Sequence, residues 1–166
     1  MIRAPFIRSG AFLGMGLGAF VDGIAFHQLL QWHGMVSSRR PPTNLVNLEV
    51  NMFWDGVFYL GAWLATGIGA ALLWRTRRVP SLPGQGRLVL AGALIGWGGF
   101  NIADGILHHH LLDLHHIRTG PHQNLADGLF LALSAALVIA GLALLRPGRR
   151  QRLPRSEDRI PLRGTP

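Results

Sequence analysis

The sequence predicts an all-α integral membrane protein, a four-helix bundle built from two parallel helix-hairpin repeats with both termini in the cytoplasm. Three observations predict this fold. Hydrophobic residues make up 49% of the 166 residues and charged residues only 14%, a balance that favours a membrane protein over a soluble domain. Four apolar segments each approach or exceed the ~20 residues that a helix needs to cross a bilayer. A motif of Asp, Gly and His residues occurs twice, each time toward the end of such a segment.

The four apolar segments lie roughly at residues 10–32, 52–74, 88–114 and 125–145. The first segment follows Arg3 and Arg8, as a secretory signal would, but it is too long for the apolar region of a signal and carries Asp22 and His27. We therefore expect it to be retained as a helix. Glycine is frequent in all four segments, which is typical of helices that approach one another closely in lipid.

These segments divide the chain into one transmembrane bundle and a tail. We place the bundle at residues 9–146, with repeat units at about 9–75 and 88–146. Residues 147–166 are rich in Pro, Gly and charged residues, so we expect a disordered basic cytoplasmic tail.

Arginine determines the predicted orientation in the membrane. All sixteen basic residues are arginine, and thirteen of them fall in the two termini and the middle loop. The positive-inside rule then places both termini in the cytoplasm of a bacterial cell and the ends of the first and third helices outside its plasma membrane. Because the net charge of +8 arises from these topology signals, we expect the lipid bilayer and no nucleic acid as partner. Other membrane-complex subunits or a homo-oligomer are further candidate partners.

The repeated motif is the strongest indication of function. It spans Asp22–His33 and returns 82 positions later at Asp104–His115, reading D-G-I-x-x-H-x-L-L-x-x-H both times. Ionisable residues within an apolar span are costly and mark a functional site by default. A shorter echo, D-G-x-F, begins at Asp55 in the second segment and at Asp127 in the fourth.

Helix geometry brings residues of the motif and its echo to one depth. At about 1.5 Å of rise per residue, His27, Asp55, His109 and Asp127 lie in one layer. Two histidines and two aspartates suit a transition metal, and without cysteine a thiolate site is excluded. The alternative role for the two aspartates is to accept the ring N–H of a ligating histidine.

The helical wheel suggests a layered polar interior. Glycine-lined stripes carry His27 and His109, and we expect these stripes of the first and third helices to face one another. Asp22 and Asp104 fall on other stripes about 140° away, too far to converge on the same point. We expect an outer layer of further metal-binding histidines, namely His33, His115 and His116. Supporting or proton-carrying roles are assigned to Asp22, Asn51, Asp104 and His108, while His110 and His122 are left unassigned.

Three stretches carry a resemblance to a known family. They are F-V-D-G-I-A-F-H-Q-L-L-Q-W-H at 20–33, N-M-F-W-D-G at 51–56 and D-G-I-L-H-H-H-L-L-D-L-H-H at 104–116. The sequence resembles the DUF2243 family of bacterial four-span membrane proteins over residues 9–146. This resemblance implies a four-span bundle but no activity, and an association of relatives with cytochrome oxidase assembly favours copper. Relatives often read W-H-H where this chain has Trp32-His33-Gly34, so a ligand at position 34 is missing here.

The sequence therefore predicts a His/Asp transition-metal site near the external face, with copper favoured over iron or zinc. Redox chemistry or metal handling would be its function, and a metal-dependent membrane oxidoreductase is one form of it. One alternative is a haem b protein with His27 and His109 as axial ligands. Another needs no cofactor: a proton- or cation-conducting protein or an oxidase-assembly subunit, in which the Asp/His ladder carries charge.

Overall fold

The computed structural model describes residues 3–78 and 80–146, and within them every regular element is helical. Helix α1 (Ala4–Asp22) continues into the π-helix η1 (Gly23–Leu29), and α3 (Gln85–Asp104) continues into the π-helix η3 (Gly105–Leu111). Helix α2 (Leu45–Arg75) ends in a 3₁₀ turn, η2 (Thr76–Arg78), and α4 (Gln123–Leu145) follows the last loop. The predicted tail at 147–166 lies outside the described residues.

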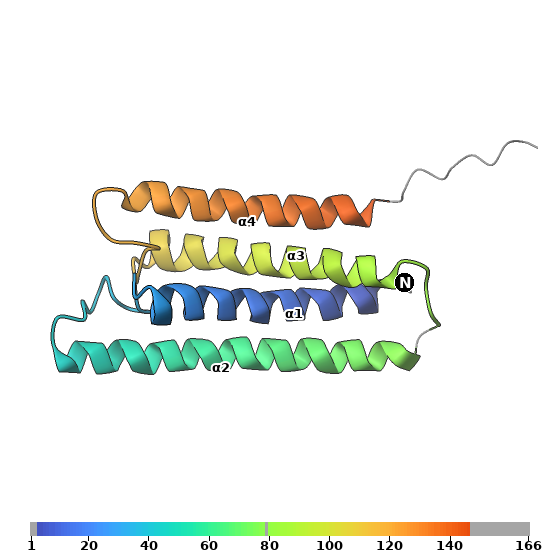
Figure 1. The fold of residues 1–166 in the computed structure, drawn as a ribbon, viewed down its shortest axis with the longest axis horizontal. Coiled ribbons are helices and arrows are strands. Elements are labelled where there is room, and N and C mark those ends of the chain that lie inside the picture. Colours follow the sequence, from blue (N-terminus) through green and yellow to red (C-terminus); the bar gives the residue numbers. More distant parts are fainter. Residues whose placement is uncertain (1–2, 79, 147–166) are drawn as a thin grey trace, which may run out of the picture.

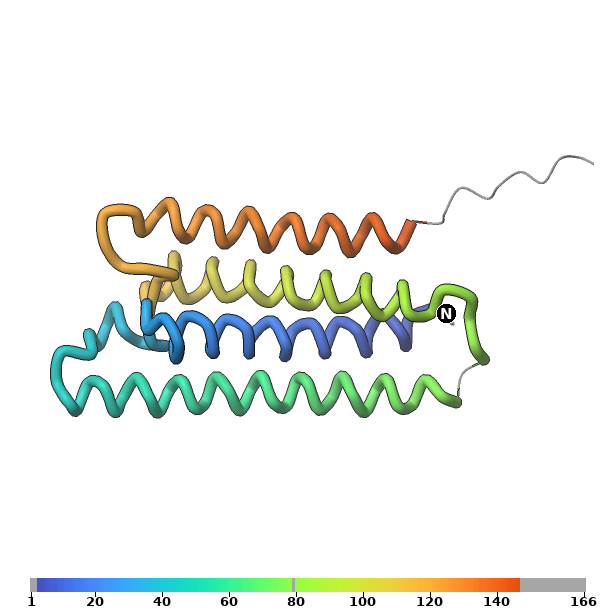
Figure 2. The backbone as a smooth tube through the Cα atoms, in the orientation of Figure 1, coloured from blue at the N-terminus to red at the C-terminus, as the bar shows by residue number. Residues whose placement is uncertain are grey.

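The four long helices lie side by side in the order α2, α1, α3, α4 (Figure 1). Helix α1 packs against both α2 and α3, and α3 packs against α4. The α1–α2 and α3–α4 loops lie at one end of this row, and the α2–α3 loop lies at the other (Figure 2). The all-helical, four-helix fold predicted from the sequence is confirmed.

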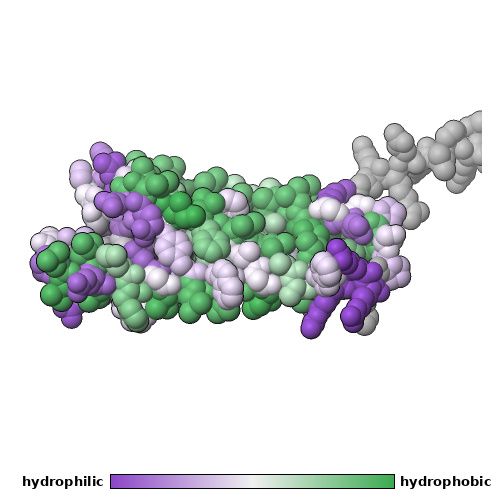
Figure 3. Space-filling model, turned by 60° about the horizontal axis from the view of Figure 1, so that its bottom comes forward, coloured by the Kyte–Doolittle hydropathy of each residue, from purple (hydrophilic) through white to green (hydrophobic). Residues whose placement is uncertain are grey.

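Each long helix can cross a membrane by its length and composition. The four stretches, with their continuations, are Ala4–Leu29, Leu45–Arg78, Gln85–Leu111 and Gln123–Leu145. The outer helices α2 and α4 expose large apolar side chains, such as Phe53 at 66% and Leu133 at 64%. Figure 3 shows the resulting apolar band with hydrophilic residues at both ends. Such an exposed apolar surface is favourable in lipid and unfavourable in water.

Glycines allow α1 and α3 to pack backbone against backbone. Gly10 and Gly14 of α1 lie directly against carbonyl groups of α3, while Gly92 and Gly96 lie against carbonyl groups of α1. A Cβ atom at any of these four positions would collide with main-chain atoms. Each pair forms a G-x-x-x-G pattern, which brings membrane helices close together.

The glycine stripes that carry the motif histidines face other helices than predicted. Gly16 and Gly23, on the stripe of His27, pack against Thr66 and Tyr59 of α2 and not against α3. Gly98 and Gly105, on the stripe of His109, likewise pack against α4. The expectation that these stripes face one another across α1 and α3 is therefore wrong. Each helix has a second glycine face, and a helical wheel does not identify which neighbour each face meets.

Candidate metal centre

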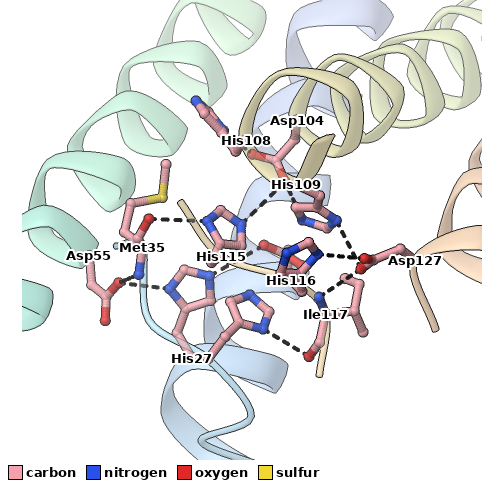
Figure 4. Close-up of polar contacts among 12 residues, drawn as sticks. His27, Met35, Asp55, Asp104, His108, His109, His115, His116, Ile117 and Asp127 are labelled. Carbon is pink, nitrogen blue, oxygen red and sulfur yellow. Dashed lines mark hydrogen bonds and ion pairs between the residues drawn. The ribbon is translucent and has the colours of Figure 1, made fainter. Parts of the chain in front are cut away.

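The two histidines at the centre of the motif are buried and held by aspartates of the neighbouring helices. His27 Nδ1 lies 2.8 Å from Asp55 Oδ1 of α2, and His109 Nδ1 lies 3.1 Å from Asp127 Oδ1 of α4. The side chains of both histidines have no exposed surface. Figure 4 shows both aspartates on the outer side of the histidine cluster. Nδ1 of His27 is thus hydrogen-bonded to Asp55 and Nδ1 of His109 lies in ion-pair contact with Asp127, while Nε2 of each ring is directed elsewhere.

The π-helices explain a contact that an ideal α-helix would not allow. Asp22 Oδ2 lies 3.6 Å from His27 Nε2, and Asp104 Oδ2 lies 3.5 Å from His109 Nε2. In an α-helix, residues five apart point about 140° away from one another. The i→i+5 hydrogen bonds of a π-helix place such residues above one another, and π-helical turns are frequent at functional sites. The prediction that Asp22 and Asp104 lie on separate stripes is corrected by this geometry.

Both π-helices end in the same turn. Gln31 and Asp113 each adopt φ 49°, a left-handed conformation that costs an L-residue about 1–2 kcal/mol. The turn directs the following loops back over the helix ends, so that His33 and His115 become buried. These two histidines therefore come from loops, and the helices end at Leu29 and Leu111, before the ends of the apolar segments predicted at 10–32 and 88–114.

The loop histidines are each held by the backbone of the other half of the chain. His33 Nδ1 donates to the carbonyl oxygen of Ile117 at 3.0 Å, and His115 Nδ1 donates to that of Met35 at 3.1 Å (Figure 4). Because a carbonyl only accepts hydrogen bonds, Nδ1 of both rings carries the proton. Nε2 of a neutral ring then presents a lone pair, the form in which histidine binds metals.

Asp55 and Asp127 also hold the two residues whose carbonyls accept these hydrogen bonds. The amide of Met35 donates to Asp55 Oδ1 at 2.8 Å, and the amide of Ile117 donates to Asp127 Oδ1 at 3.0 Å. One aspartate in each half therefore orients a helix histidine directly and, through the main chain of Met35 or Ile117, the loop histidine of the opposite half. Outer carboxylates of this kind determine the tautomer and direction of ligating histidines.

The four imidazoles gather in one cluster. The ring centroids of His27 and His33 are 4.5 Å apart, those of His109 and His115 are 4.8 Å apart, and His33 stacks on His115 at 4.8 Å. Nε2 of His27, His33 and His109 is buried without a hydrogen-bond partner. Donor atoms within 4.8 Å of one another form two groups, His27–His33–His115 and Asp104–His109–His115. Either group could hold a metal ion.

His33 remains uncharged in this environment. Its burial, with the neighbouring His27 and His115, lowers the pKa of His33 to about 2. The ring is therefore neutral at physiological pH, with Nε2 free to bind a metal without first releasing a proton.

The other predicted residues occupy supporting positions. His116 uses both ring nitrogens, with Nδ1 2.7 Å from Asp127 Oδ2 and Nε2 2.9 Å from Asp113 Oδ1, so it joins neither group. His108 Nδ1 lies 2.6 Å from Asp104 Oδ1. Asn51 accepts the amide of Val36 at 3.2 Å and fastens the α1–α2 loop to α2. His110 and His122 are exposed.

A cavity of about 1030 Å³ reaches the cluster from the loop end of the molecule. His27, His33 and Asp55 line it together with His116 and Asn51. Its remaining lining comes mainly from the α1–α2 loop, including Ser37, Ser38, Pro41 and Pro42. An ion or a small polar molecule can therefore approach the imidazoles from this end without crossing the apolar band.

Two functional groups could not be predicted from the sequence because they belong to the backbone. The carbonyls of Met35 and Ile117 orient His115 and His33, yet a carbonyl is present at every residue. The available signal was positional: both residues follow a motif histidine by two places, and they too are 82 positions apart. Asp104, assigned a supporting role, also proves to be a member of one donor group.

Comparison with known proteins identifies a family but no characterised relative. Residues 9–148 match the family described as "Predicted membrane protein (DUF2243)". A search of curated proteins found no match, and neither did a search of solved structures.

Proposed function

The chain belongs to the DUF2243 family of predicted membrane proteins, and from this membership and the geometry of its histidine cluster we propose that it binds a transition metal within the membrane. The observation that supports the proposal is the arrangement of four buried imidazoles. Nδ1 of three of them donates to an acceptor of the protein, and His109 Nδ1 lies 3.1 Å from Asp127 Oδ1, so their Nε2 atoms are the ones left for an ion. Burying such unpaired polar atoms is costly, and a metal ion removes that cost.

Copper is the ion that we favour, ahead of iron and zinc. The donors are mainly imidazole nitrogens with carboxylate oxygens nearby, and the chain contains no cysteine. For nitrogen and oxygen sites, affinity among divalent ions rises to a maximum at Cu²⁺. The proposed role is handling of the metal or redox chemistry with it.

The arrangement of the rings favours ions over a haem. A haem b held by His27 and His109 would need the space between these two rings. His115 occupies part of that space, with its ring centroid 6.0 Å from that of His27 and 4.8 Å from that of His109. The stacked pair of His33 and His115 fills the position that a macrocycle would take.

The proposed position of the site is near the external face of the membrane. The histidines of the cluster lie in η1, η3 and the loops that follow them, and Figure 1 shows these loops at the end of the helices opposite the α2–α3 connection. Arg75, Arg77, Arg78 and Arg87 lie in or beside the α2–α3 connection at the opposite end. The positive-inside rule places that arginine-rich end in the cytoplasm, so the cavity would open outward.

Metal analysis of the purified protein tests the proposal. The protein would be purified in detergent, loaded separately with Cu²⁺, Zn²⁺ and Fe²⁺, freed of excess ion and analysed by mass spectrometry for metals. We expect bound metal, with copper displacing the other two in competition. The double variant His27→Ala/His109→Ala should lose it.

A protein that conducts protons or cations without a cofactor would give the opposite results in these measurements. Folded wild-type protein that retains no metal would contradict the proposal. Proton or cation flux in liposomes that Asp22→Asn abolishes would then support the conducting alternative. The variant His122→Ala, which changes an exposed histidine, controls for binding at the surface.

A further inference from the structure

Each half of the chain supplies a matching set of donors. One set is Asp22, His27 and His33, and the other, 82 positions later, is Asp104, His109 and His115. The corresponding distances agree: the carboxylate lies 3.6 Å from Nε2 of the helix histidine in the first set and 3.5 Å in the second. The two rings of a set meet edge to face, at 68° and at 70°.

Both sets contain buried polar atoms that lack a partner. In the first set these are Asp22 Oδ1, His27 Nε2 and His33 Nε2, and in the second set both ring nitrogens of His109. In that second set, Asp104 Oδ2 also lies 3.7 Å from His115 Nε2. A single ion placed in one set would leave the unpaired atoms of the other set without a partner.

The donor distances separate two positions. In the described residues, no group of donors within 4.8 Å of one another contains all four imidazoles. His115 appears in both groups, which shows that the two positions adjoin. One nitrogen atom binds one ion, so His115 Nε2 belongs to a single set, and its contact with Asp104 assigns it to the second. His27 and His33 then remain as the close donors of the first position, and Asp22 lies beside His27 there.

Electrostatics supports two ions over one. Asp22, Asp55, Asp104 and Asp127 are each at most 6% exposed. In the part of the chain that the structure describes, no arginine forms an ion pair with any of them. Buried carboxylates require compensating positive charge. Asp127 is paired with His116, whose two ring nitrogens both face carboxylates, and the other three carboxylates carry more negative charge than one divalent cation compensates.

We infer that the cluster is a two-ion centre, with one transition-metal ion bound by His27 and His33, beside Asp22, and a second bound by Asp104, His109 and His115. This inference rests on the proposed metal-binding function and adds the number of ions and the residues that bind each of them. Two imidazoles on each ion, with a carboxylate bound or adjacent, leave coordination positions open for water or a small ligand. The stacked rings of His33 and His115 hold the two ions side by side.

The number of bound Cu²⁺ ions tests the two-ion centre. Protein in detergent would be loaded with Cu²⁺, freed of excess and counted by metal and amino-acid analysis. We expect about two ions per chain, and about one in each of the double variants His27→Ala/His33→Ala and His109→Ala/His115→Ala. Electron paramagnetic resonance should show a magnetically interacting pair in the wild type and the signal of an isolated Cu²⁺ in either double variant. The control variant His122→Ala should keep two ions.

The outcomes separate this inference from the function on which it rests. One ion per chain in the wild type overturns the two-ion centre and leaves metal binding intact, whereas none overturns both. Two ions that persist in the double variants, or that give non-interacting signals in the wild type, also overturn it. Because the wild-type count and spectrum need no substitution, the inference remains testable even where a variant fails to fold.

Discussion

At the scale of single residues, the two nitrogen atoms of each imidazole have different roles: Nδ1 faces an oxygen of the protein, and Nε2 is available to an ion. Asp55 and Asp127 lie beside Nδ1 of His27 and His109. Main-chain carbonyls accept hydrogen bonds from Nδ1 of His33 and His115. The aspartates thereby orient the imidazoles without having to bind the metal themselves. Changes to them should weaken binding without removing a donor from either metal position.

The variant Asp55→Asn tests this supporting role. Asparagine keeps the size and one accepting oxygen but loses the charge that orients His27 and the amide of Met35. Loss of such an outer partner lowers metal affinity by about 10–100-fold. Competition with a chromophoric chelator measures the change, and Glu49→Gln, an exposed position on the same helix, should leave affinity unaltered. Equal affinities of the Asp55 variant and the wild type would contradict the assignment.

The buried loop histidine His33 predicts how stability depends on pH. Its pKa of about 2 in the folded protein, caused by burial and by His27 and His115, lies below the ~6.5 of an unfolded chain. Between these values the unfolded state binds more protons, so this contribution is complete above about pH 6.5 and is lost as the pH falls. The Tm advantage of metal-free wild type over the variant His33→Gln should thus be larger at about pH 8 than at about pH 5. An equal advantage at both pH values would contradict the prediction.

At the scale of helices, the close contact of α1 and α3 carries the architecture. Gly14 of α1 meets the backbone of Ala93, whereas Gly61 of α2 has open space around it. Substitution Gly14→Leu should force the helices apart, and overpacking of this kind costs about 1–3 kcal/mol. Thermal unfolding in detergent measures the loss, with Gly61→Leu as the matched control on a lipid-facing surface. Similar Tm values for the two variants would show that the contact is unimportant.

Much of the helical framework could be predicted from the sequence, but the path of the loops could not. The apolar spans and the burial of His27 and His109 follow from composition and periodicity, because they depend on one helix at a time. The approach of Asp22 to His27 depends on a π-helical segment, and the burial of His33 depends on a left-handed turn at Gln31. Neither has a distinctive local sequence, since glutamine rarely marks such a turn.

At the scale of the whole molecule, the metal should stabilise the folded state. Each ion contacts side chains at the end of one helix and in the loop that follows it, so the ion fastens that loop in its folded position. A ligand at about 100 times its Kd adds about 2.7 kcal/mol when it binds only the folded state. Cu²⁺ should therefore raise the Tm of the wild type and leave that of His27→Ala/His109→Ala nearly unchanged. An equal rise in both proteins would place the ion elsewhere.

Each loop supplies a carbonyl that orients the histidine of the other loop, so the site requires both halves of the chain. His33 is oriented by the carbonyl of Ile117, and His115 by the carbonyl of Met35. A single helical hairpin therefore has its own histidines but lacks the carbonyl that orients its loop histidine. A chain severed in the α2–α3 connection could rebuild the cluster only by reassociation of its fragments. The smallest assembly competent to capture the ion is thus a pair of hairpins, whether or not a peptide bond joins them.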